Sequence, residues 1–168
     1  MDDFATLPGG IYVGGSGSNL IDADHDMPGS FDNLILTFGG KDTVLAGLGD
    51  DTVSLGEGND LAFGGGGSDR LFGDEGNDIL AGGAGQDSFV FESGFGKDVV
   101  LDFQPGTDVL SIEAHINGLA ISTAADLARH VSGDAISSTI TLGSDTIKLV
   151  GVSKADLLGH LDQYVKIV

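Results

Sequence analysis

The stretch GGGGSDRLFGDEGNDILAGGAGQDSFV, residues 64–90, contains three aspartates that are nine residues apart, each shortly after a cluster of glycines. These aspartates are Asp69, Asp78 and Asp87. Glycine inside regular structure costs backbone entropy, roughly 0.5–1 kcal/mol per residue relative to alanine. Because this entropy cost recurs three times at the same spacing, the pattern indicates a repeated structural unit in which glycine and aspartate each have a fixed position.

The same nine-residue pattern extends outward from this stretch and covers residues 28–101. Eight copies align, the last of them after two extra residues, Phe91 and Glu92, and the fourth position is glycine in every copy but the first. The sixth position holds Asn33, Asp42, Asp51, Asp60, Asp69, Asp78, Asp87 and Asp98, and the eighth holds Ile35, Val44, Val53, Ala62, Leu71, Leu80, Phe89 and Val100. A flexible glycine-rich linker does not keep two positions in phase in this way, so the copies predict a repeat fold.

Each nonapeptide predicts a six-residue turn that ends in aspartate, followed by a three-residue strand. Because alternate side chains of a strand face opposite ways, only the central apolar residue of each strand points inward. Two nonapeptides make a flattened coil of ~18 residues with a strand on each side, and stacked coils pair their strands in parallel. The aspartates then form two columns: Asp51, Asp69 and Asp87 lie along one edge, and Asp42, Asp60, Asp78 and Asp98 lie along the other.

The charge of the chain narrows the partners that such columns could have. With 26 acidic and 7 basic residues, the formal net charge is −19, which disfavours nucleic acid and anionic membrane surfaces. Successive carboxylates in a column would lie about one strand spacing, ~4.8 Å, apart, and would repel one another unless a cation lay between them. Carboxylates and backbone carbonyls are hard oxygen ligands that select calcium over zinc or copper. A glycine-rich β-solenoid without metal is the alternative interpretation.

The nonapeptide resembles the calcium-binding repeat G-G-x-G-x-D-x-U-x of RTX (repeats-in-toxin) proteins, in which U is apolar. The resemblance covers residues 28–101 and is closest over residues 46–90. It implies a protein dominated by β structure, with a parallel β-roll of nonapeptide repeats, calcium ions between successive turns, and export by a type I secretion system. The resemblance also implies a small α+β carboxyl-terminal cap, similar to that of serralysin-like secreted proteins.

Carried over to this sequence, the resemblance assigns the metal ligands to aspartate side chains and to backbone carbonyls of the turns. Each ion is expected to lie between two aspartates of one column, and the implied pairs give about five calcium ions: Asp51 with Asp69, Asp69 with Asp87, Asp42 with Asp60, Asp60 with Asp78, and Asp78 with Asp98. The aspartates are Asp42, Asp51, Asp60, Asp69, Asp78, Asp87 and Asp98. The turn residues are Gly47, Gly49, Gly56, Gly58, Gly64, Gly65, Gly66, Gly67, Gly73, Glu75, Gly76, Gly82, Gly83, Ala84 and Gly85.

Some positions depart from the repeat. Asn33 replaces an aspartate, and Phe31 and Phe38 replace glycines, so the first turns are expected to bind calcium weakly or not at all. Asp74 takes a glycine position, where its carbonyl could still serve. Residues 14–22 resemble an isolated copy with Asn19 in place of aspartate. The acidic run that follows, with Asp22, Asp24 and Asp26, is either a separate calcium site or a solvated loop.

The chain divides into three predicted parts: residues 1–27 with one degenerate repeat, the roll over 28–101, and a cap over 102–168 that carries a secretion signal. Within the cap, residues 122–131 predict a helix capped by Ser122 or Thr123. Gly143-Ser144 predicts a hairpin turn, and Ser153 with Asp156 predicts the start of a second helix. Residues 102–112, with Asp108 in phase, continue the roll loosely.

Several classes of protein are disfavoured by the sequence. It has no cysteine, no apolar run of the ~18 residues that a membrane span requires, and no basic and apolar segment typical of a signal peptide. It also contains no H-E-x-x-H, G-x-S-x-G or G-K-[ST] motif, so we expect a secreted module that is not an enzyme. The alternative function is that of a stand-alone adhesion or matrix protein whose roll binds a protein or a polysaccharide.

The outward strand positions of the two predicted sheets differ in polarity. On the strands that follow Asp42, Asp60, Asp78 and Asp98 they are almost wholly apolar: Thr43, Leu45, Leu61, Phe63, Ile79, Ala81, Val99 and Leu101. A soluble monomer rarely exposes such a face. We expect it to be covered by residues 4–27, by the cap helix over 123–131, or by a partner protein or a second copy. The alternative is that β-propensity alone selected these residues.

Overall fold

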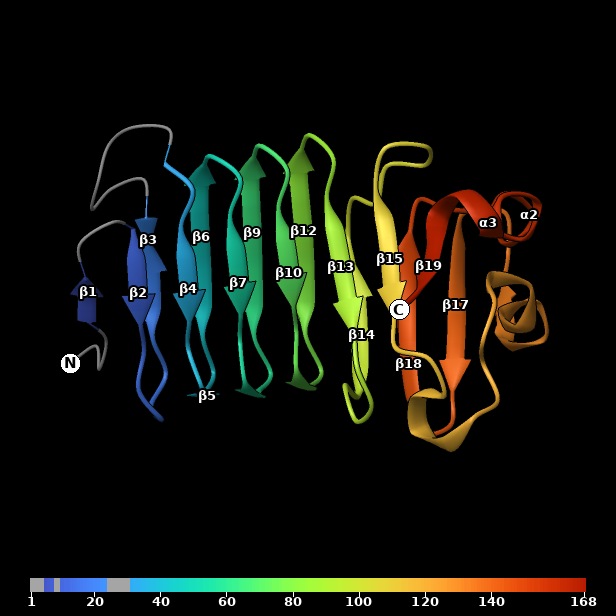
Figure 1. Ribbon diagram of the computed structural model, residues 1–168, viewed down its shortest axis with the longest axis horizontal. Helices are drawn as coiled ribbons and strands as arrows, with labels where there is room; N and C mark the ends of the chain where they lie inside the picture. The colour runs from blue at the N-terminus through green and yellow to red at the C-terminus, as the bar shows by residue number, and fades with distance from the viewer. Residues whose placement is uncertain (1–4, 8–9, 24–30) are drawn as a thin grey trace.

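A computed structural model describes residues 5–7, 10–23 and 31–168. The chain forms a stack of flattened coils with a cap at its carboxyl-terminal end (Figure 1). Each coil contributes one strand to each of two sheets, and consecutive coils pair in parallel, so that Leu71 lies between Val53 and Phe89 in one sheet. The predicted parallel β-roll with a small α+β cap is therefore confirmed.

The first sheet has eight strands and runs the whole length of the stack. In spatial order its strands are β1 (Ala5–Leu7), β2 (Ile11–Val13), β4 (Leu34–Leu36), β7 (Thr52–Ser54), β10 (Arg70–Phe72), β13 (Ser88–Phe91), β15 (Val109–Ile112) and β19 (Val165–Ile167). Only β1 is antiparallel to its neighbour within this sheet.

The second sheet also has eight strands and packs behind the first (Figure 1). In spatial order its strands are β3 (Leu20–Asp22), β6 (Thr43–Leu48), β9 (Leu61–Gly66), β12 (Ile79–Ala84), β14 (Lys97–Val100), β18 (Asp145–Val150), β17 (Ser137–Leu142) and β16 (Val131–Gly133). A third, narrow sheet lies along one edge of the coils and consists of β5 (Gly39–Gly40), β8 (Glu57–Gly58) and β11 (Glu75–Gly76).

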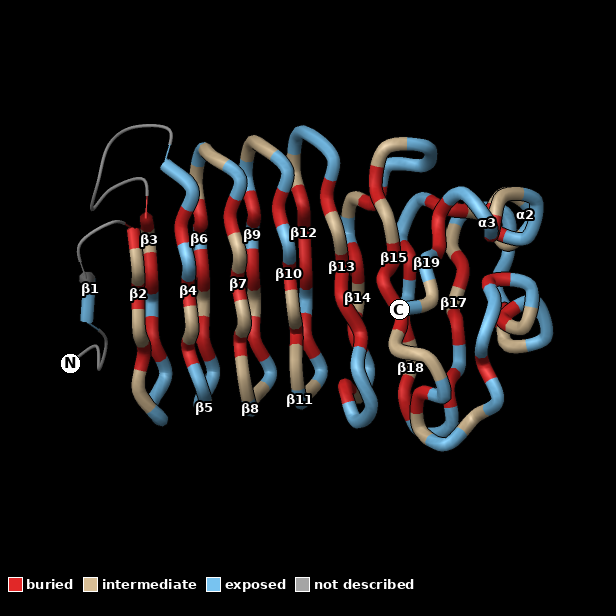
Figure 2. Tube along the Cα trace, in the orientation of Figure 1, coloured by how far each residue is buried: buried red, intermediate tan, exposed pale blue. Residues whose placement is uncertain are grey.

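One apolar side chain from the centre of each roll strand points between the two sheets, as the repeat predicts. Figure 2 shows this core as the buried segments at mid-strand. The inward residues Ile35, Val44, Val53, Ala62, Leu71, Leu80, Phe89 and Val100 are all fully buried. Because each coil adds only two such side chains, the roll has a thin core.

The cap closes the stack with a larger core and short helices: η1 (Ile116–Gly118), η2 (Ala124–His130), α2 (Lys154–Gly159) and α3 (Leu161–Tyr164). The ring of Phe103 packs between Phe89 at the end of the roll and Tyr164 in α3, with centroid distances of 6.2 and 5.8 Å. The predicted hairpin is present as β17 and β18, joined by Gly143 and Ser144. The helix at Ser153 is also present, whereas the segment after Thr123 is a 3₁₀ helix. None of the helices in the described parts of the chain is long and apolar enough to span a bilayer.

Several apolar residues on the outer face of the second sheet are exposed, so the expectation that the cap helix covers this face is wrong. The described residues of the amino-terminal segment do not cover it either, and residues 4, 8–9 and 24–27 lie outside the described part of the chain. The described part of the amino-terminal segment instead extends the sheets as β1, β2 and β3, and η2 contacts α3, β17 and β19. The apolar residues Leu45, Phe63, Ile79 and Leu101 remain 36–41% exposed.

Candidate metal centres

The sixth residue of each nonapeptide lies at the start of a strand, where the turn meets the sheet, and its side chain points into the roll. All seven predicted aspartates of this position are buried, with 1–3% of their surface exposed. Burial of so many carboxylates in a thin core is costly unless each is paired or neutralised.

Hydrogen bonds connect the aspartates of each column. In the first column the backbone N–H of Asp51 donates to Oδ1 of Asp69 (2.8 Å), and the N–H of Asp69 donates to Oδ1 of Asp87 (3.0 Å). The second column repeats this bond from Asp42 to Asp60, from Asp60 to Asp78 and from Asp78 to Asp98, at 2.7, 2.8 and 3.0 Å. The structure thus brings the predicted aspartates together in two columns.

The other carboxylate oxygen has no hydrogen-bond partner in the protein at six of these aspartates. These buried Oδ2 atoms belong to Asp42, Asp60, Asp69, Asp78, Asp87 and Asp98. A buried anionic oxygen without a partner loses its hydration and receives nothing in return. Each of these atoms therefore requires a proton or a cation from outside the chain.

The pKa values of the same groups respond to this environment. Burial, together with neighbouring carboxylates, raises the pKa of Asp98 to about 8 and those of Asp69 and Asp78 to about 7, against the opposing effect of the amide hydrogen bonds. Burial likewise raises the pKa of Asp60 to about 6. The metal-free roll thus resists ionisation of the residues that would have to be ionised to bind calcium.

Glycines leave room beside the unpartnered oxygens. A Cβ atom on Gly73 would stand 2.9 Å from Oδ2 of Asp78 and 3.2 Å from Oδ2 of Asp98, and one on Gly64 or Gly82 would collide with Oδ2 of Asp69 or Asp87. Only a residue without a side chain leaves this space free.

The turn glycines also bring carbonyls of neighbouring coils close together. Gly65, with φ +110°, lies against the carbonyl of Gly47, and Gly83 lies against that of Gly65. The predicted turn residues that face a carbonyl of the preceding coil in this way are Gly49, Gly56, Gly58, Gly65, Gly67, Gly76, Gly83 and Gly85. The backbone of each coil can therefore stack directly on the next.

The chemistry of this donor set fits a hard cation. In the described parts of the chain no three His, Cys, Asp or Glu side chains gather into one group, so side chains alone would not hold a metal ion. Calcium takes six to eight oxygen ligands, including backbone carbonyls, and two aspartates of neighbouring coils with carbonyls of the turns supply oxygen only.

The columns end in different residues from those within them. Asn33 and Asn19 occupy the aspartate position at the amino-terminal ends of the first and second columns. At the far end of the first column, Asp108 accepts from the N–H of Asp87 through Oδ1 (3.1 Å) and from the N–H of Gln104 through Oδ2 (2.8 Å). Because both of its oxygens are bonded, Asp108 differs from the six aspartates above.

Asp74 and Asp102 are among the carboxylates outside the predicted set that bind turn amides of a neighbouring coil. Asp102 accepts from the N–H groups of Gly82 (3.0 Å) and Gly83 (2.9 Å). Asp74, with φ +58°, accepts from the N–H of Gly56 (3.1 Å) and from the hydroxyl of Ser54 (2.6 Å). For Asp74 the sequence did give a signal, since it replaces a glycine, but the expectation concerned its carbonyl and not its side chain.

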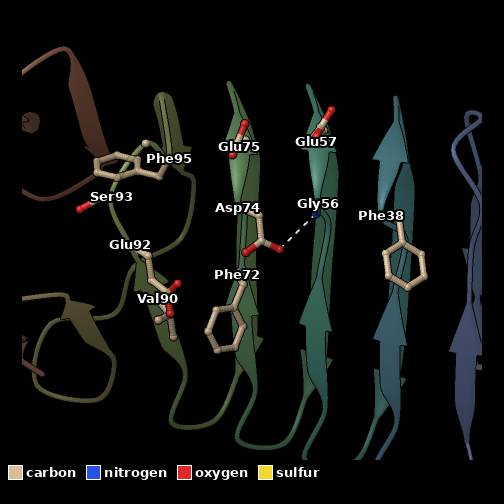
Figure 3. Close-up of a pocket in the computed structure, with 11 residues that line it drawn as sticks. Phe38, Gly56, Glu57, Phe72, Asp74, Glu75, Val90, Glu92, Ser93 and Phe95 are labelled. Atoms are coloured by element: carbon tan, nitrogen blue, oxygen red, sulfur yellow. Dashed lines mark hydrogen bonds between the residues drawn. The ribbon is translucent and has the colours of Figure 1, made fainter. Parts of the chain in front are cut away.

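Asp74 lies in a cavity of about 260 Å³ on the outside of the roll. Figure 3 shows its carboxylate above Phe72, turned toward the amide of Gly56, with Glu57 and Glu75 beyond. The Asp74 carboxylate already has its partners, and Glu75, a predicted turn ligand, is exposed. Of the acidic run beyond the second strand, Asp22 lies at the end of β3, whereas Asp24 and Asp26 lie outside the described residues.

Comparison with known proteins agrees with the repeat. The family model of RTX calcium-binding nonapeptide repeats matches residues 29–53, 54–89 and 63–100. The AlgE6R3 subunit of the Azotobacter vinelandii mannuronan C5-epimerase, a solution structure, is 31% identical, with a TM-score of 0.40, over 73% of this chain and 73% of that one. The extracellular lipase LipA from Serratia marcescens is 15% identical, with a TM-score of 0.48, over 98% of this chain. The chain spans 41% of the length of that lipase. No curated protein matches the sequence significantly.

Proposed function

The chain belongs to the family of RTX calcium-binding nonapeptide repeats, and from this premise we propose that its two aspartate columns hold the calcium. Each ion would lie between aspartates of neighbouring coils, with about five ions per chain. The pairs are Asp51 with Asp69, Asp69 with Asp87, Asp42 with Asp60, Asp60 with Asp78, and Asp78 with Asp98. The observation that carries this proposal is the buried, unpartnered Oδ2 that recurs beside a glycine in successive coils.

Calcium supplies the positive charge that these buried carboxylates lack. The chain supplies and positions the oxygen ligands. Oδ1 of each aspartate fixes the side chain through the amide of the preceding coil, which leaves Oδ2 directed at the space beside the glycines. Carbonyls of the predicted turn residues complete the oxygen set, and the inward apolar residues pack once the coils stack.

Equilibrium dialysis with calcium chloride tests this assignment directly. We expect about five ions per chain at millimolar calcium, and little binding when magnesium replaces calcium, because magnesium demands a smaller, near-octahedral set of ligands. A chain that binds no calcium at millimolar concentration would contradict the proposal.

We further propose that calcium controls when the chain folds. Because a metal site does not exist in the unfolded chain, its binding free energy becomes folding free energy. With the affinity of extracellular modules, ~10⁻⁴–10⁻³ M, the chain would stay unfolded at cytosolic calcium and fold outside the cell. The tail supports this order of events, since Val165–Ile167 pairs with β15 and Val165 is buried in the folded protein. A tail read by a type I secretion apparatus is accessible only before folding.

Export of the full chain by a type I apparatus, with and without its last four residues, tests the secretion role. We expect export to be lost without the tail. Equal export of both forms would show that the tail is not the secretion signal. That result would leave the calcium-binding proposal untouched, because calcium binding is measured on the purified proteins.

We propose that this chain acts without a catalytic site of its own. Its sequence contains none of the nucleophile, zinc or phosphate-loop motifs named above. Lipase and mannuronan epimerase assays on the purified, calcium-loaded chain should show no turnover above a boiled control. Turnover that saturates with substrate would overturn this proposal.

The open apolar face favours a second candidate function, adhesion to a protein or to another copy of the chain. Leu45, Phe63 and Ile79 form neighbouring outward positions on β6, β9 and β12, and all three are exposed. Sedimentation velocity in calcium should then show self-association that Phe63→Glu abolishes and that the exposed Leu48→Glu, beyond this patch, leaves unchanged. A monomer at every concentration would leave only a foreign partner for this face.

A further inference from the structure

Asn33 and Asn19 stand where the repeat otherwise has aspartate, and the backbone around them follows the repeat. The N–H of Asn33 donates to Oδ1 of Asp51 (2.7 Å), and the N–H of Asn19 donates to Oδ1 of Asp42 (2.6 Å). These are the same bonds that link one aspartate to the next within each column. The two turns therefore differ from the others in a side chain, an amide in place of a carboxylate.

The amide nitrogen of Asn33 is bonded to two backbone carbonyls. Nδ2 donates to the carbonyl of Phe31 (3.1 Å), two residues earlier, and to that of Ala46 (3.2 Å), thirteen residues later in the next turn. Asn19 is similar in part, because its Nδ2 donates to the carbonyl of Gly17, also two residues earlier, and to Oδ1 of Asp42 (3.2 Å). The Oδ1 atom of each asparagine is buried without a hydrogen-bond partner, as Oδ2 of the aspartates is, but it belongs to a neutral group. The side-chain NH₂ group thus binds oxygens of the turn on the inside of the column.

The repeat places equivalent carbonyls around each aspartate. For Asp69 these are the carbonyls of Gly67 and Gly82. The structure shows the convergence at Gly64, where an added Cβ would stand 2.6 Å from the carbonyl oxygen of Gly82 and would collide with Oδ2 of Asp69. An ionised carboxylate has no hydrogen to donate, so at Asp69 the acceptors face one another without a donor between them.

We infer that the amide groups of Asn33 and Asn19 are built-in substitutes for the cation at the amino-terminal end of each column. The inference rests on the proposed function, in which calcium lies among the acceptors at the aspartate turns. At Asn33 the NH₂ group satisfies the carbonyls of Phe31 and Ala46 by hydrogen bonding, and the side chain adds no negative charge. The first turn of each column can therefore close without metal, and calcium is required only from the next turn onward.

A change of Asn33 to aspartate tests this inference, because it removes the donor and restores the charge while keeping the shape of the side chain. In equilibrium dialysis with calcium chloride, Asn33→Asp should bind about one ion per chain more than the wild-type chain. In a calcium titration followed by circular dichroism, the same variant should reach its folding midpoint at a higher calcium concentration than wild type, because its first turn no longer closes without metal. Asn59→Asp is the matched control, because Asn59 is exposed and lies on the outer side of the turn, where its Oδ1 accepts from the N–H of Asn77.

Asn33→Ala keeps the test decisive if the aspartate variant fails to fold. A substitute for the cation is not a ligand, so Asn33→Ala should bind as many ions as wild type. Loss of one ion in Asn33→Ala, or no gain in a folded Asn33→Asp, would overturn the inference while leaving the aspartate columns in place. A wild-type chain that binds no calcium would instead overturn the proposed function and this inference together.

Discussion

The environments of aspartate side chains in the roll and in the cap shift their pKa values in opposite directions. In the roll, Asp69 and Asp78 are buried, each keeps one oxygen without a partner, and burial raises their pKa values. In the cap, Asp126 and Asp134 lie at the surface, where backbone N–H groups hydrogen-bond to their carboxylates and lower the pKa values. The cap supplies its own compensation for these two charges, whereas the six buried aspartates of the roll with an unpartnered Oδ2 receive no such compensation from the chain.

The cores of the two regions differ in the same direction. Strands such as β7 and β9 each bury one small apolar residue between the sheets, Val53 and Ala62, while the cap adds larger side chains such as Phe103, Leu157 and Tyr164 to the core. A thin core with many glycines recovers little of the entropy lost on folding. Under the proposed function, the roll would depend on its ligand for stability, whereas the cap would depend on ordinary burial and hydrogen bonding.

Removal of calcium should have the largest effect on this comparison. In excess EGTA we expect the roll to lose its β-type circular dichroism, because the buried carboxylates are then uncompensated, and millimolar calcium to restore it. Magnesium at the same concentration serves as the control. A sharp β-type spectrum in EGTA that calcium does not change would mean that the roll folds by itself, as the cap does.

Single substitutions should distinguish aspartates with an unpartnered oxygen from those with both oxygens hydrogen-bonded, through their effect on the calcium midpoint of folding. Asp69 contributes to two proposed sites, so Asp69→Ala should raise the calcium concentration at the folding midpoint about tenfold, which corresponds to ~1.4 kcal/mol of binding free energy. Asp108→Ala should shift this midpoint less, because both oxygens of Asp108 are held by amides, and Asn33→Ala should also shift it less. Calcium titration followed by circular dichroism measures all three. Equal midpoints would show that the register or the metal assignment is wrong.

The contribution of aspartates to the free energy of unfolding should change with pH in opposite directions in the roll and in the cap. For Asp69 and Asp78, with pKa values near 7 in the metal-free fold against an ordinary value of 3.8, the folded state binds more protons than the unfolded state between these limits. The free energy of unfolding of the metal-free roll therefore falls as the pH rises from about 4 to about 7. Asp126 and Asp134, with lowered pKa values, stabilise the cap above the ordinary pKa of aspartate, and this contribution is lost as the pH falls below it.

Circular dichroism of the metal-free chain in EGTA at pH 5.5 and 7.5 measures this effect for the roll, and we expect more residual β-type signal at pH 5.5. Calcium must displace the same protons, so its apparent affinity should be weaker at pH 5.5 than at pH 7.5. A metal-free chain that is less stable at the lower pH would show that these carboxylates are ionised in the folded roll.

The smallest expected effect lies in the cap. Ser153 caps α2, and its hydroxyl oxygen accepts from the N–H of Asp156 (3.0 Å). Ser153→Ala should cost ~1 kcal/mol and lower the melting temperature in calcium by roughly 2–4 °C, with no change in the calcium midpoint. The exposed Ser68→Ala is the control. A shift of the calcium midpoint in Ser153→Ala would indicate that the cap and the metal sites are coupled.

The periodic part of the molecule could be predicted from the sequence because each of its contacts repeats at a fixed spacing. The fixed phase of aspartate and the apolar eighth residue was sufficient to predict the coil, the two columns and the inward residues. The hairpin at Gly143 and the start of α2 at Ser153 could also be predicted, because glycine is typical of a tight turn and serine of a helix N-cap. Even the degenerate copy around Asn19 kept its place, since β3 pairs with β6.

The remaining features depend on contacts that have no period. β2, with its buried Tyr12, pairs with β4 although Gly10, and not an aspartate, comes directly before it. The tail strand β19 joins the first sheet beside β15, a pairing between segments far apart in the sequence. Asp102 binds turn amides one coil away, and no local pattern marks such a residue. The apolar composition of the outward face was predicted correctly, but the prediction that the cap helix covers this face was wrong.

The eighteen-residue separation of paired strands has a consequence for how this chain can change in length. Deletion of residues 64–81 removes one full coil and returns every later strand to its own sheet. Deletion of residues 64–72 removes half a coil, moves each later strand to the opposite sheet, and carries β14 and β15 away from the sides on which the cap strands β18 and β19 join them. The roll can therefore be lengthened or shortened only in even numbers of nonapeptides, so parity, rather than the total number of repeats, is the quantity that its architecture conserves.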